Sequence, residues 1–355
     1  MLKLLVIVLV SCQAMATEYI VRLPSDPQAL SLNAAAASVP IKRHLRYFEG
    51  FVADLSDRQV ANFKNQGFMV EKNGTVHIMG RPRVAASDTV TPVPWGTTAV
   101  NAPQANKLPN GSGEGVTICV VDTGAGTDHP DLAGVYLPGV AIIKTTATGK
   151  EDWYDDMGHG THVSGTIAAK ADSQNGVQGV APKAKIFPVK VLDSQGSGTD
   201  ANVADGIKAC IGHASIISMS LGGGDSSIMK EAVADAQRAG LIVVAAAGND
   251  GGAVIYPAAY PGVLAVSAVD VNYKLADFSN FGPEIAYAAP GVAVRSTIPG
   301  GFATWDGTSM ATPHVAAVLA ISKSRGAQLK ARDIKLTKEQ QGNGFVDAWL
   351  SAQVK

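Results

Sequence analysis

The sequence has little cysteine, few aromatic side chains and no excess of charge of either sign. Only 3 of its 355 residues are cysteines, 6% are aromatic, and the formal net charge is −1. Without a basic field, the composition offers nothing to attract phosphates or anionic lipids, so we expect neither nucleic acid nor a membrane surface as a partner. With 46% hydrophobic residues, the chain is too apolar for disorder and can bury one large core beside a smaller domain.

The apolar run near the N-terminus is too short to cross a bilayer. It covers residues 4–10, follows Lys3 and precedes Ala14-Met15-Ala16, whereas a spanning helix needs about 20 residues. This pattern is typical of a cleaved export signal, residues 1–16, and predicts a secreted, extracellular protein with no membrane span. The residues up to Cys12 also resemble a bacterial lipoprotein box, which would instead tether the precursor by a lipid.

Beyond the signal only two cysteines remain, Cys119 and Cys210. In an exported chain such a pair can form a disulfide, and the alternative is two small buried hydrophobic side chains. The sequence does not give the Cα separation that a bridge requires, so both interpretations stay open. No cysteines and histidines are spaced as zinc ligands, and neither cysteine has the setting of a nucleophile.

Two structured sections and a linker can be separated by their patterns. Residues 17–79 alternate strand-like and helix-like stretches, which predicts a small α+β domain. Strands are expected at residues 19–23 and 51–55, and a helix within residues 56–68, capped by Ser56. Residues 80–92 contain arginine, proline, serine and threonine without periodicity. They predict an exposed linker.

The remaining section, residues 93–355, has the pattern of a parallel sheet covered by helices. Short apolar runs alternate with helical stretches from Gly115 onward, which predicts an α/β domain. Strands are expected at residues 116–121, 186–191, 216–219, 242–246 and 263–267. In such sheets ligands bind beyond the carboxyl ends of the strands, so the residues directly after these runs are the first candidates for chemistry.

Three segments carry side chains that together can activate a nucleophile. Asp122 follows the first expected strand, although an aspartate there is usually only a turn residue. His159 lies between two glycines at an expected helix start, where small neighbours let a substrate approach the imidazole. Ser309 precedes a helical run, and a helix N-terminus favours developing negative charge. A serine hydroxyl needs a base to take its proton, and a histidine oriented by a carboxylate is the usual base.

A second histidine, His162, follows His159 by three residues. Two histidines at this spacing can hint at a metal site. The alternative is that His162 points into the helix packing and forms a hydrogen bond there, and this is the interpretation we favour.

The three segments, at residues 122–124, 158–166 and 307–317, match the three signature blocks of the subtilases in that family's order of Asp, His and Ser. The likeness runs from about residue 92 to residue 352. It implies a three-layer α/β catalytic domain with a mainly parallel sheet, and a serine endopeptidase that works through an acyl-enzyme. A fourth block, residues 243–250, implies that Asn249 donates to the tetrahedral oxyanion together with the backbone N–H of the serine.

The resemblance also implies an extended substrate lying as an added strand, which predicts broad specificity because main chain is read more than side chains. The substrate-binding residues it implies are Gly196, Ser197, Gly198, Ser220, Leu221, Gly222 and Gly248. Thr199 and Asp200 stand where many relatives carry an aromatic lid, so the distal pocket is expected to be more open. Ile255 aligns with the floor of the pocket for the residue before the scissile bond, where it would shorten the pocket.

Residues 17–79 resemble the subtilase pro-segment, an intramolecular chaperone and inhibitor that the enzyme removes from itself. The matches include residues 19–21, 47–51 and 76–79. The resemblance ends the pro-segment at Met79 or Gly80 and leaves residues 80–92 as a processing arm. The alternative is a permanent N-terminal domain.

Subtilases commonly bind calcium, a hard ion that takes oxygen ligands. Asp131 aligns with a ligand of the strong site, and Asp172 lies in the loop that would wrap it. Thr91 stands where an amide side chain is usual. A second, weaker site lacks an acid at Ala286.

Three functions can use this set of residues. The leading hypothesis is an active secreted endopeptidase, a monomer whose partners are polypeptide substrates and its own pro-segment. The second is a catalytically silent subtilase that serves as a binding scaffold, which usually would have lost one of the three residues. The third is an esterase or transpeptidase that uses the same serine.

Overall fold

The computed structural model describes residues 17–23, 32, 36–82, 92–170 and 176–353. The chain forms two compact units, residues 1–73 and residues 74–355. Residues 74–79, which the sequence groups with the N-terminal section, therefore pack within the second unit. In the described part of the chain no helix is both long and apolar enough to cross a bilayer.

The described residues of the first unit include a four-stranded antiparallel sheet and a helix. Its strands, in spatial order, are β2 (Ile41–His44), β3 (Gly50–Leu55), β1 (Thr17–Arg22) and β4 (Met69–Lys72). Helix α2 (Asp57–Asn65) begins at the predicted cap, because Ser56 Oγ accepts the Gln59 N–H and the Gln59 side chain accepts the Ser56 N–H. The small core is closed by three phenylalanine rings in edge-to-face contact, Phe51, Phe63 and Phe68.

The second unit is built on a nine-stranded sheet. All neighbouring strands run parallel except the edge pair of β18 and β19. The spatial order is β18 (Ala331–Arg332), β19 (Phe345–Val346), β15 (Ile285–Pro290), β14 (Leu264–Val269), β13 (Ile242–Ala246), β11 (Ile216–Met219), β7 (Thr117–Asp122), β9 (Lys185–Lys190) and β8 (Val140–Ala141). The five strands predicted from the sequence are all present, within two residues of their expected ends.

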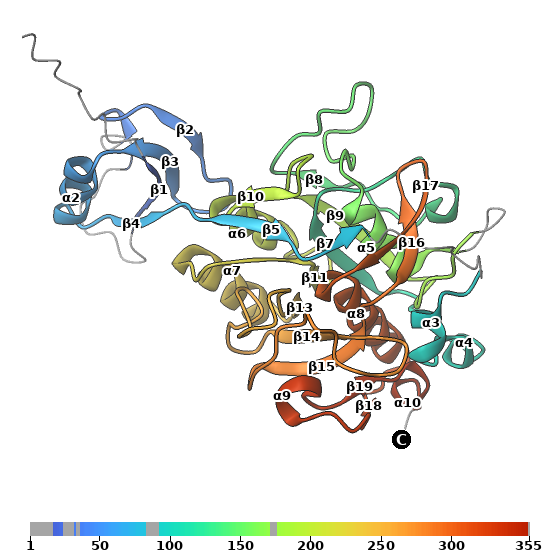
Figure 1. Ribbon diagram of the computed structural model, residues 1–355. Helices are drawn as coiled ribbons and strands as arrows, with labels where there is room; N and C mark the ends of the chain where they lie inside the picture. Colours follow the sequence, from blue (N-terminus) through green and yellow to red (C-terminus); the bar gives the residue numbers. More distant parts are fainter. Residues whose placement is uncertain (1–16, 24–31, 33–35, 83–91, 171–175, 354–355) are drawn as a thin grey trace, which may run out of the picture. The chain divides into compact units, whose positions relative to one another are not determined.

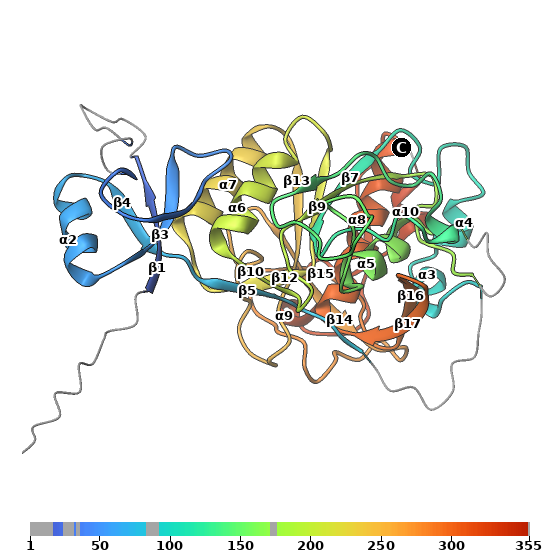
Figure 2. The same ribbon diagram turned by 90° about the horizontal axis from the view of Figure 1, so that it is seen from above.

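Helices cover both faces of this sheet (Figures 1 and 2). Helices α5 (His159–Ala168) and α8 (Thr308–Ser324) pack together on one face, and α6 (Asp200–Ala209) and α7 (Ser227–Arg238) pack together on the other. Shorter helices are α3 (Trp95–Ala99), α4 (Ala102–Ala105), η1 (Pro130–Leu132), α9 (Lys338–Gln341) and α10 (Ala348–Ser351). Because both faces are covered, the central strands are mostly apolar and buried. The predicted three-layer α/β fold is confirmed.

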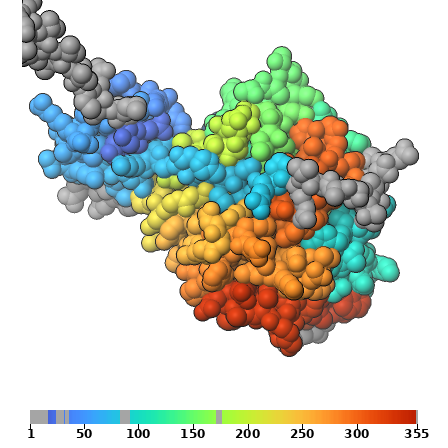
Figure 3. Space-filling model, in the orientation of Figure 1, coloured from blue at the N-terminus to red at the C-terminus, as the bar shows by residue number. Residues whose placement is uncertain are grey.

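Two small antiparallel sheets lie beside the main one, and a single segment takes part in both. Strand β5 (Thr75–Ile78) pairs with β10 (Ser197–Thr199) and with β12 (Leu221–Gly223). Strand β6 (Arg81–Pro82) pairs with β17 (Gly301–Asp306), which also pairs with β16 (Val294–Ile298). The light-blue segment that contains β5 runs over the surface of the second unit rather than through its interior (Figures 1 and 3).

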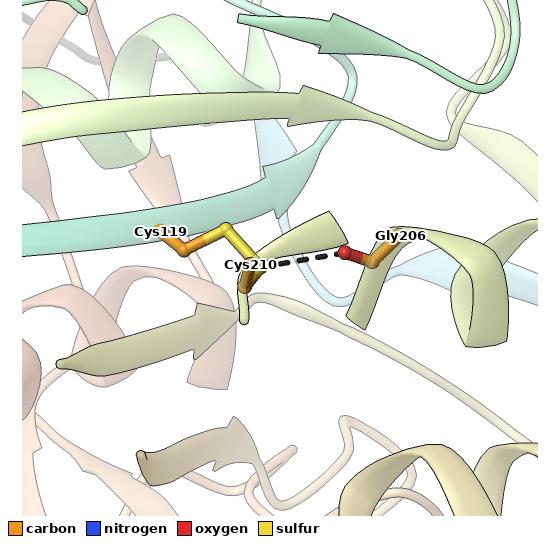
Figure 4. The surroundings of a disulfide bond; sticks show 3 residues. All are labelled: Cys119, Gly206 and Cys210. Carbon is orange, nitrogen blue, oxygen red and sulfur yellow. Dashed lines mark hydrogen bonds between the residues drawn. A yellow bond between two sulfur atoms is a disulfide. The ribbon is translucent and has the colours of Figure 1, made fainter. Parts of the chain in front are cut away.

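The two cysteines of the described residues form a disulfide. Cys119 in β7 and Cys210 at the end of α6 are joined, with a Cα–Cα distance of 5.8 Å (Figure 4). The bridge therefore ties the central sheet to a helix that covers it. The residues it joins are 91 positions apart, and a loop of that size predicts a stabilisation of about 4–5 kcal/mol from the lost entropy of the unfolded chain.

Candidate active site

The predicted reacting residues come together where the parallel strands end. Asp122 is the last residue of β7, and Asn249 follows β13 by three positions. His159 is the first residue of α5, and Ser309 is the second residue of α8. These helices pack on the same face of the sheet, so their N-termini are brought to the same edge as the strand ends.

Asp122 and His159 are hydrogen-bonded to one another and fully buried. His159 Nδ1 lies 2.7 Å from Asp122 Oδ1, which also accepts the Thr123 N–H at 2.7 Å. An acceptor at Nδ1 places the proton of a neutral imidazole there and leaves Nε2 able to accept one. Within the described residues Nε2 has no hydrogen-bond partner. It faces Gly80, since a Cβ built on that glycine would lie 2.9 Å from Nε2.

The N-terminus of α5 is held by Asp155, a buried carboxylate that the sequence analysis missed. Its Oδ1 accepts the N–H groups of Met157 and Gly158 and the Thr123 hydroxyl, at 2.8–3.1 Å. Its Oδ2 accepts the backbone N–H and the hydroxyl of Thr161, at 2.8 and 2.6 Å. These bonds satisfy donors that a helix start leaves open and fix the backbone around His159. An aspartate four residues before a histidine at a helix start was the only sequence signal for it.

Ser309 is locked to Ser220 by a reciprocal pair of hydrogen bonds. Its hydroxyl donates to Ser220 O at 2.8 Å, and the Ser220 hydroxyl donates to Ser309 O at 2.8 Å. The second bond exists because Pro313, four residues further on in α8, has no N–H to give to Ser309 O. Pro313 is the sixth residue of the helix, and Ser220 replaces the missing donor.

The peptide group between Met79 and Gly80 lies against these residues. The Ser309 N–H donates to Met79 O at 2.9 Å, and the Met79 N–H donates to Ser220 O at 3.2 Å. Gly307 allows this approach, because a Cβ built there would lie 2.2 Å from Met79 O. The Met79 carbonyl carbon therefore lies between a serine at a helix N-terminus and an imidazole with an open nitrogen.

Asn249 is oriented by the residue before Ser309. Its Oδ1 accepts both the backbone N–H and the hydroxyl of Thr308, each at 2.9 Å. Because both are donors, Oδ1 must be the oxygen, and the amide NH₂ is turned away from Thr308. The sequence analysis expected this NH₂ to be a donor at the site, and its orientation is compatible with that role.

The residues expected to bind substrate surround β5. Ser197 pairs with His77 and Gly198 with Val76 on one side, and Leu221 pairs with Ile78 and Gly222 with His77 on the other. Gly196 O accepts the Ile78 N–H at 3.0 Å. Residues 75–78 thus complete a three-stranded sheet in the way that an added peptide strand would.

Ile255 lies between two glycines of the site. A Cβ built on Gly222 would lie 2.4 Å from Ile255 Cδ1, and one built on Gly248 would lie 3.2 Å from Ile255 Cγ1. A side chain at position 222 would therefore displace the isoleucine side chain, and one at position 248 would crowd it.

His162 packs inside the fold, as we expected. Its Nε2 lies 3.1 Å from Val294 O, and its ring stacks on Trp305 with a centroid distance of 5.0 Å. Burial lowers the pKa of His162 to about 3, and burial lowers that of His314 to about 4. Both rings are therefore neutral at neutral pH. Among the described residues no group of three or more acidic, histidine or cysteine side chains is arranged to hold a metal ion.

Of the two candidate calcium ligands, the structure describes Asp131. Asp131 is fully buried, its Oδ2 accepts the Val177 N–H at 2.8 Å, and its backbone oxygen accepts the Lys170 N–H at 3.0 Å. The loop of residues 170–177 is thus anchored to Asp131 at both ends. Asp172 and Thr91 lie outside the described residues.

Comparisons with known proteins point to one family. The model of the subtilase family matches residues 113–346. The chain is 42% identical over 317 residues to the thermostable alkaline protease of Halalkalibacterium halodurans, an alignment covering 85% of this chain and 82% of that protein. It is 37% identical over 318 residues to subtilisin E of Bacillus subtilis, covering 86% and 79%. It is 44% identical over 237 residues to subtilisin Savinase of Lederbergia lenta, covering 66% and 85%.

The structure predicts that Asp155 positions His159. In wild type both carboxylate oxygens of Asp155 accept hydrogen bonds. In Asp155→Asn an NH₂ group replaces one of these oxygens, so at least one buried N–H loses its acceptor. We expect kcat for a chromogenic peptide to fall about tenfold or more with little change in KM, since strand pairing is untouched, and stability to fall by about 1–3 kcal/mol.

Asp152→Asn is the matched control. Asp152 is exposed, and its substitution removes the same charge from the same loop. The pH dependence of kcat, followed from pH 5 to pH 9, separates positioning from a general loss of folded protein. If kcat and its pH profile match those of the control, Asp155 does not position His159.

Proposed function

The chain belongs to the subtilase family and is a serine endopeptidase, and we propose that Ser309, His159, Asp122 and Asn249 carry its chemistry. We also propose that its first substrate is its own Met79–Gly80 bond. The observation that carries both proposals is the bond from the Ser309 N–H to Met79 O, at 2.9 Å, beside the open Nε2 of His159.

The proposed reaction begins with a rotation of the Ser309 hydroxyl from Ser220 O toward His159 Nε2. Nε2 takes the hydroxyl proton while Oγ attacks the carbonyl carbon of Met79. Asp122 stabilises the resulting imidazolium through Nδ1. Nε2 then gives the proton to the Gly80 nitrogen as the C–N bond breaks, which leaves an acyl-enzyme on Ser309. Water repeats the sequence and restores the serine.

The proposed oxyanion site has two donors. One is the Ser309 N–H, already directed at Met79 O, and the other is the Asn249 NH₂, which is oriented by the two bonds that its Oδ1 accepts from Thr308. Both donors are fixed before the reaction, so they stabilise charge without reorganisation. Loss of one such donor typically costs about 10²–10³ in kcat.

Residues 17–79 are proposed to act as the pro-segment, both as folding helper and as inhibitor. Parallel sheets with distant strand pairings fold slowly, and a small partner domain can lower that barrier. The pairing of β5 with β10 and β12 supports an inhibitory role, because the tail of this section occupies the positions expected for a substrate. The product would be a monomeric extracellular enzyme, and the disulfide between Cys119 and Cys210 supports export to an oxidising compartment.

The Ser309→Ala variant should be unable to hydrolyse peptides and should remain an uncleaved precursor, because self-processing and hydrolysis share one nucleophile. Intact mass and N-terminal sequencing of the purified protein measure this directly. Ser322→Ala is the control, since Ser322 lies in the same helix but donates only to Leu319 O. Release of an N-terminus at Gly80 by the pure alanine variant would refute the proposal.

Ile255 is proposed to shorten the pocket for the residue before the scissile bond. Ile255→Gly should open space beside Gly222 and Gly248, at a stability cost of about 1–4 kcal/mol. Since one methylene is worth roughly 1–3 kcal/mol of discrimination, the ratio of kcat/KM for Phe over Ala at that position should rise at least tenfold. A peptide series varied only there, measured on both enzymes, tests this. If the Phe-to-Ala ratio is the same in both enzymes, Ile255 does not line the pocket.

Asp131 and Asp172 are proposed as ligands of a structural calcium ion. A buried carboxylate at the closure of the 170–177 loop is a suitable hard donor. When bound, the ion would add folding stability by mass action. Removing it with a chelator should therefore lower the melting temperature of the Ser309→Ala protein, and Asp131→Asn or Asp172→Asn should reduce that response. A melting temperature indifferent to the chelator would contradict the site.

A further inference from the structure

Arg81 is the second residue after the Met79–Gly80 bond, and its backbone is held in a defined register. In β6 it pairs with Asp306 of β17, and Pro82 pairs with Trp305. A substrate chain cleaved at this point would follow the same path. The position of Arg81 therefore marks where the second residue after any scissile bond would lie.

The Arg81 side chain lines a cavity of about 490 Å³ on the surface of the second unit. Its guanidinium lies over the ring of Phe278, 5.4 Å from the ring centroid. The other residues that line the cavity are Asp270, Lys274, Leu275, Ala276, Asp277, Val292 and Asp306. Apart from Arg81 itself, the lining carries three carboxylates and one ammonium group.

The carboxylates are not equally available. Asp270 Oδ1 accepts the N–H groups of Asn272 and Lys274, and Asp306 Oδ1 accepts the Ala293 N–H at 2.7 Å. These bonds hold their side chains in place at the wall of the cavity. Asp277 is exposed and directly precedes Phe278, so it supplies negative charge beside the aromatic face.

We propose that this cavity is a specificity subsite for a guanidinium side chain at the second position after the scissile bond. The proposal rests on the proposed cleavage between Met79 and Gly80. An aromatic face attracts a cation through its quadrupole, and a planar guanidinium stacks on it better than a compact ammonium does. The cavity lining carries three carboxylates and one lysine, so its net charge is negative. This charge favours an arginine or a lysine side chain over a neutral one. The enzyme thus prefers polypeptides with arginine two residues beyond the bond that it cuts.

The test uses the mature enzyme and quenched fluorescent peptides that copy residues 75–82. Only the position of Arg81 is varied, among arginine, lysine, glutamate and citrulline, which is neutral but has nearly the shape of arginine. At low ionic strength we expect kcat/KM for arginine to exceed that for citrulline about fivefold or more, with lysine between them and glutamate lowest. High salt should reduce the part of this preference that comes from the carboxylates.

Two variants identify the groups responsible. Phe278→Leu removes the aromatic face and Asp277→Asn removes one charge, and each should lower the arginine-to-citrulline ratio by at least half. Glu339→Gln removes an exposed charge from α9 and should leave the ratio at its wild-type value. The ratio is taken within each enzyme, so differences in the amount of folded protein cancel.

The outcomes separate the two proposals. If the wild-type enzyme cuts all peptides after methionine at equal rates, the arginine subsite is refuted while the proposed function stands. The subsite is equally refuted if the ratio is unchanged in both Phe278→Leu and Asp277→Asn. If no peptide is cut between methionine and glycine, the proposed cleavage itself is wrong.

Discussion

The site depends on a constraint of the sheet: parallel strands finish at the same edge, and helices that pack on one face begin there. Asp122 ends β7, and α5 and α8 begin at His159 and Thr308. The N-termini of two helices, with their open N–H groups, thus meet a strand end that carries a carboxylate. No single element could supply a base, a carboxylate and backbone donors to one small volume.

Bringing these ends together buries polar groups that must find partners, and the structure supplies them from neighbouring loops. Asp155 accepts from five donors around the start of α5. Lys190 is fully buried, and its Nζ donates to Thr123 O, Leu192 O and Asp156 Oδ1. Burial opposes ionisation of Asp156, but the bonds from Lys190 and Thr146 lower its pKa to about 2. Lys190 is therefore both paired and hydrogen-bonded, and Asp155 is hydrogen-bonded through both of its oxygens, as a low-polarity interior requires.

The sequence predicted those parts of the molecule that a short motif encodes. The strand ends, the helix starts and the positions of Asp122, His159 and Ser309 follow from local patterns, because apolar runs and glycine-flanked polar residues are contiguous in the chain. Asn249 was singled out by the resemblance to the subtilases. Cys119 and Cys210 could not be paired from the sequence, since their separation depends on how α6 lies on the sheet.

Other features depend on contacts between distant segments. The bond from the Ser220 hydroxyl to Ser309 O replaces the helical hydrogen bond that Pro313 cannot donate. The sequence shows the proline, but the donor that replaces it is 89 residues away from Ser309. The cavity around Arg81 combines β6 with residues 270–278 and 306, so it becomes visible only once the register of β6 and β17 is known. Asp155 was missed because an aspartate in a loop carries no signal until the donors around it are known.

The same main-chain pairing can serve both inhibition and catalysis, because pairing and bond cleavage draw on different interactions. Hydrogen bonds from β10 and β12 to β5 are the same before and during the reaction, so they strengthen binding without lowering the barrier. The donors at Met79 O act most strongly when that oxygen becomes charged, so they accelerate the step instead. If the Met79–Gly80 bond is cut as proposed, the segment up to Met79 would keep the pairing of β5 with β10 and β12. In the described part of the arm from Gly80, the contacts are the two-residue pairing of β6 and the contact of Arg81 with Phe278. On the proposed cleavage, the segment up to Met79 would be held as an inhibitor, while the arm from Gly80, which stays joined to the enzyme, would be held more weakly at the site.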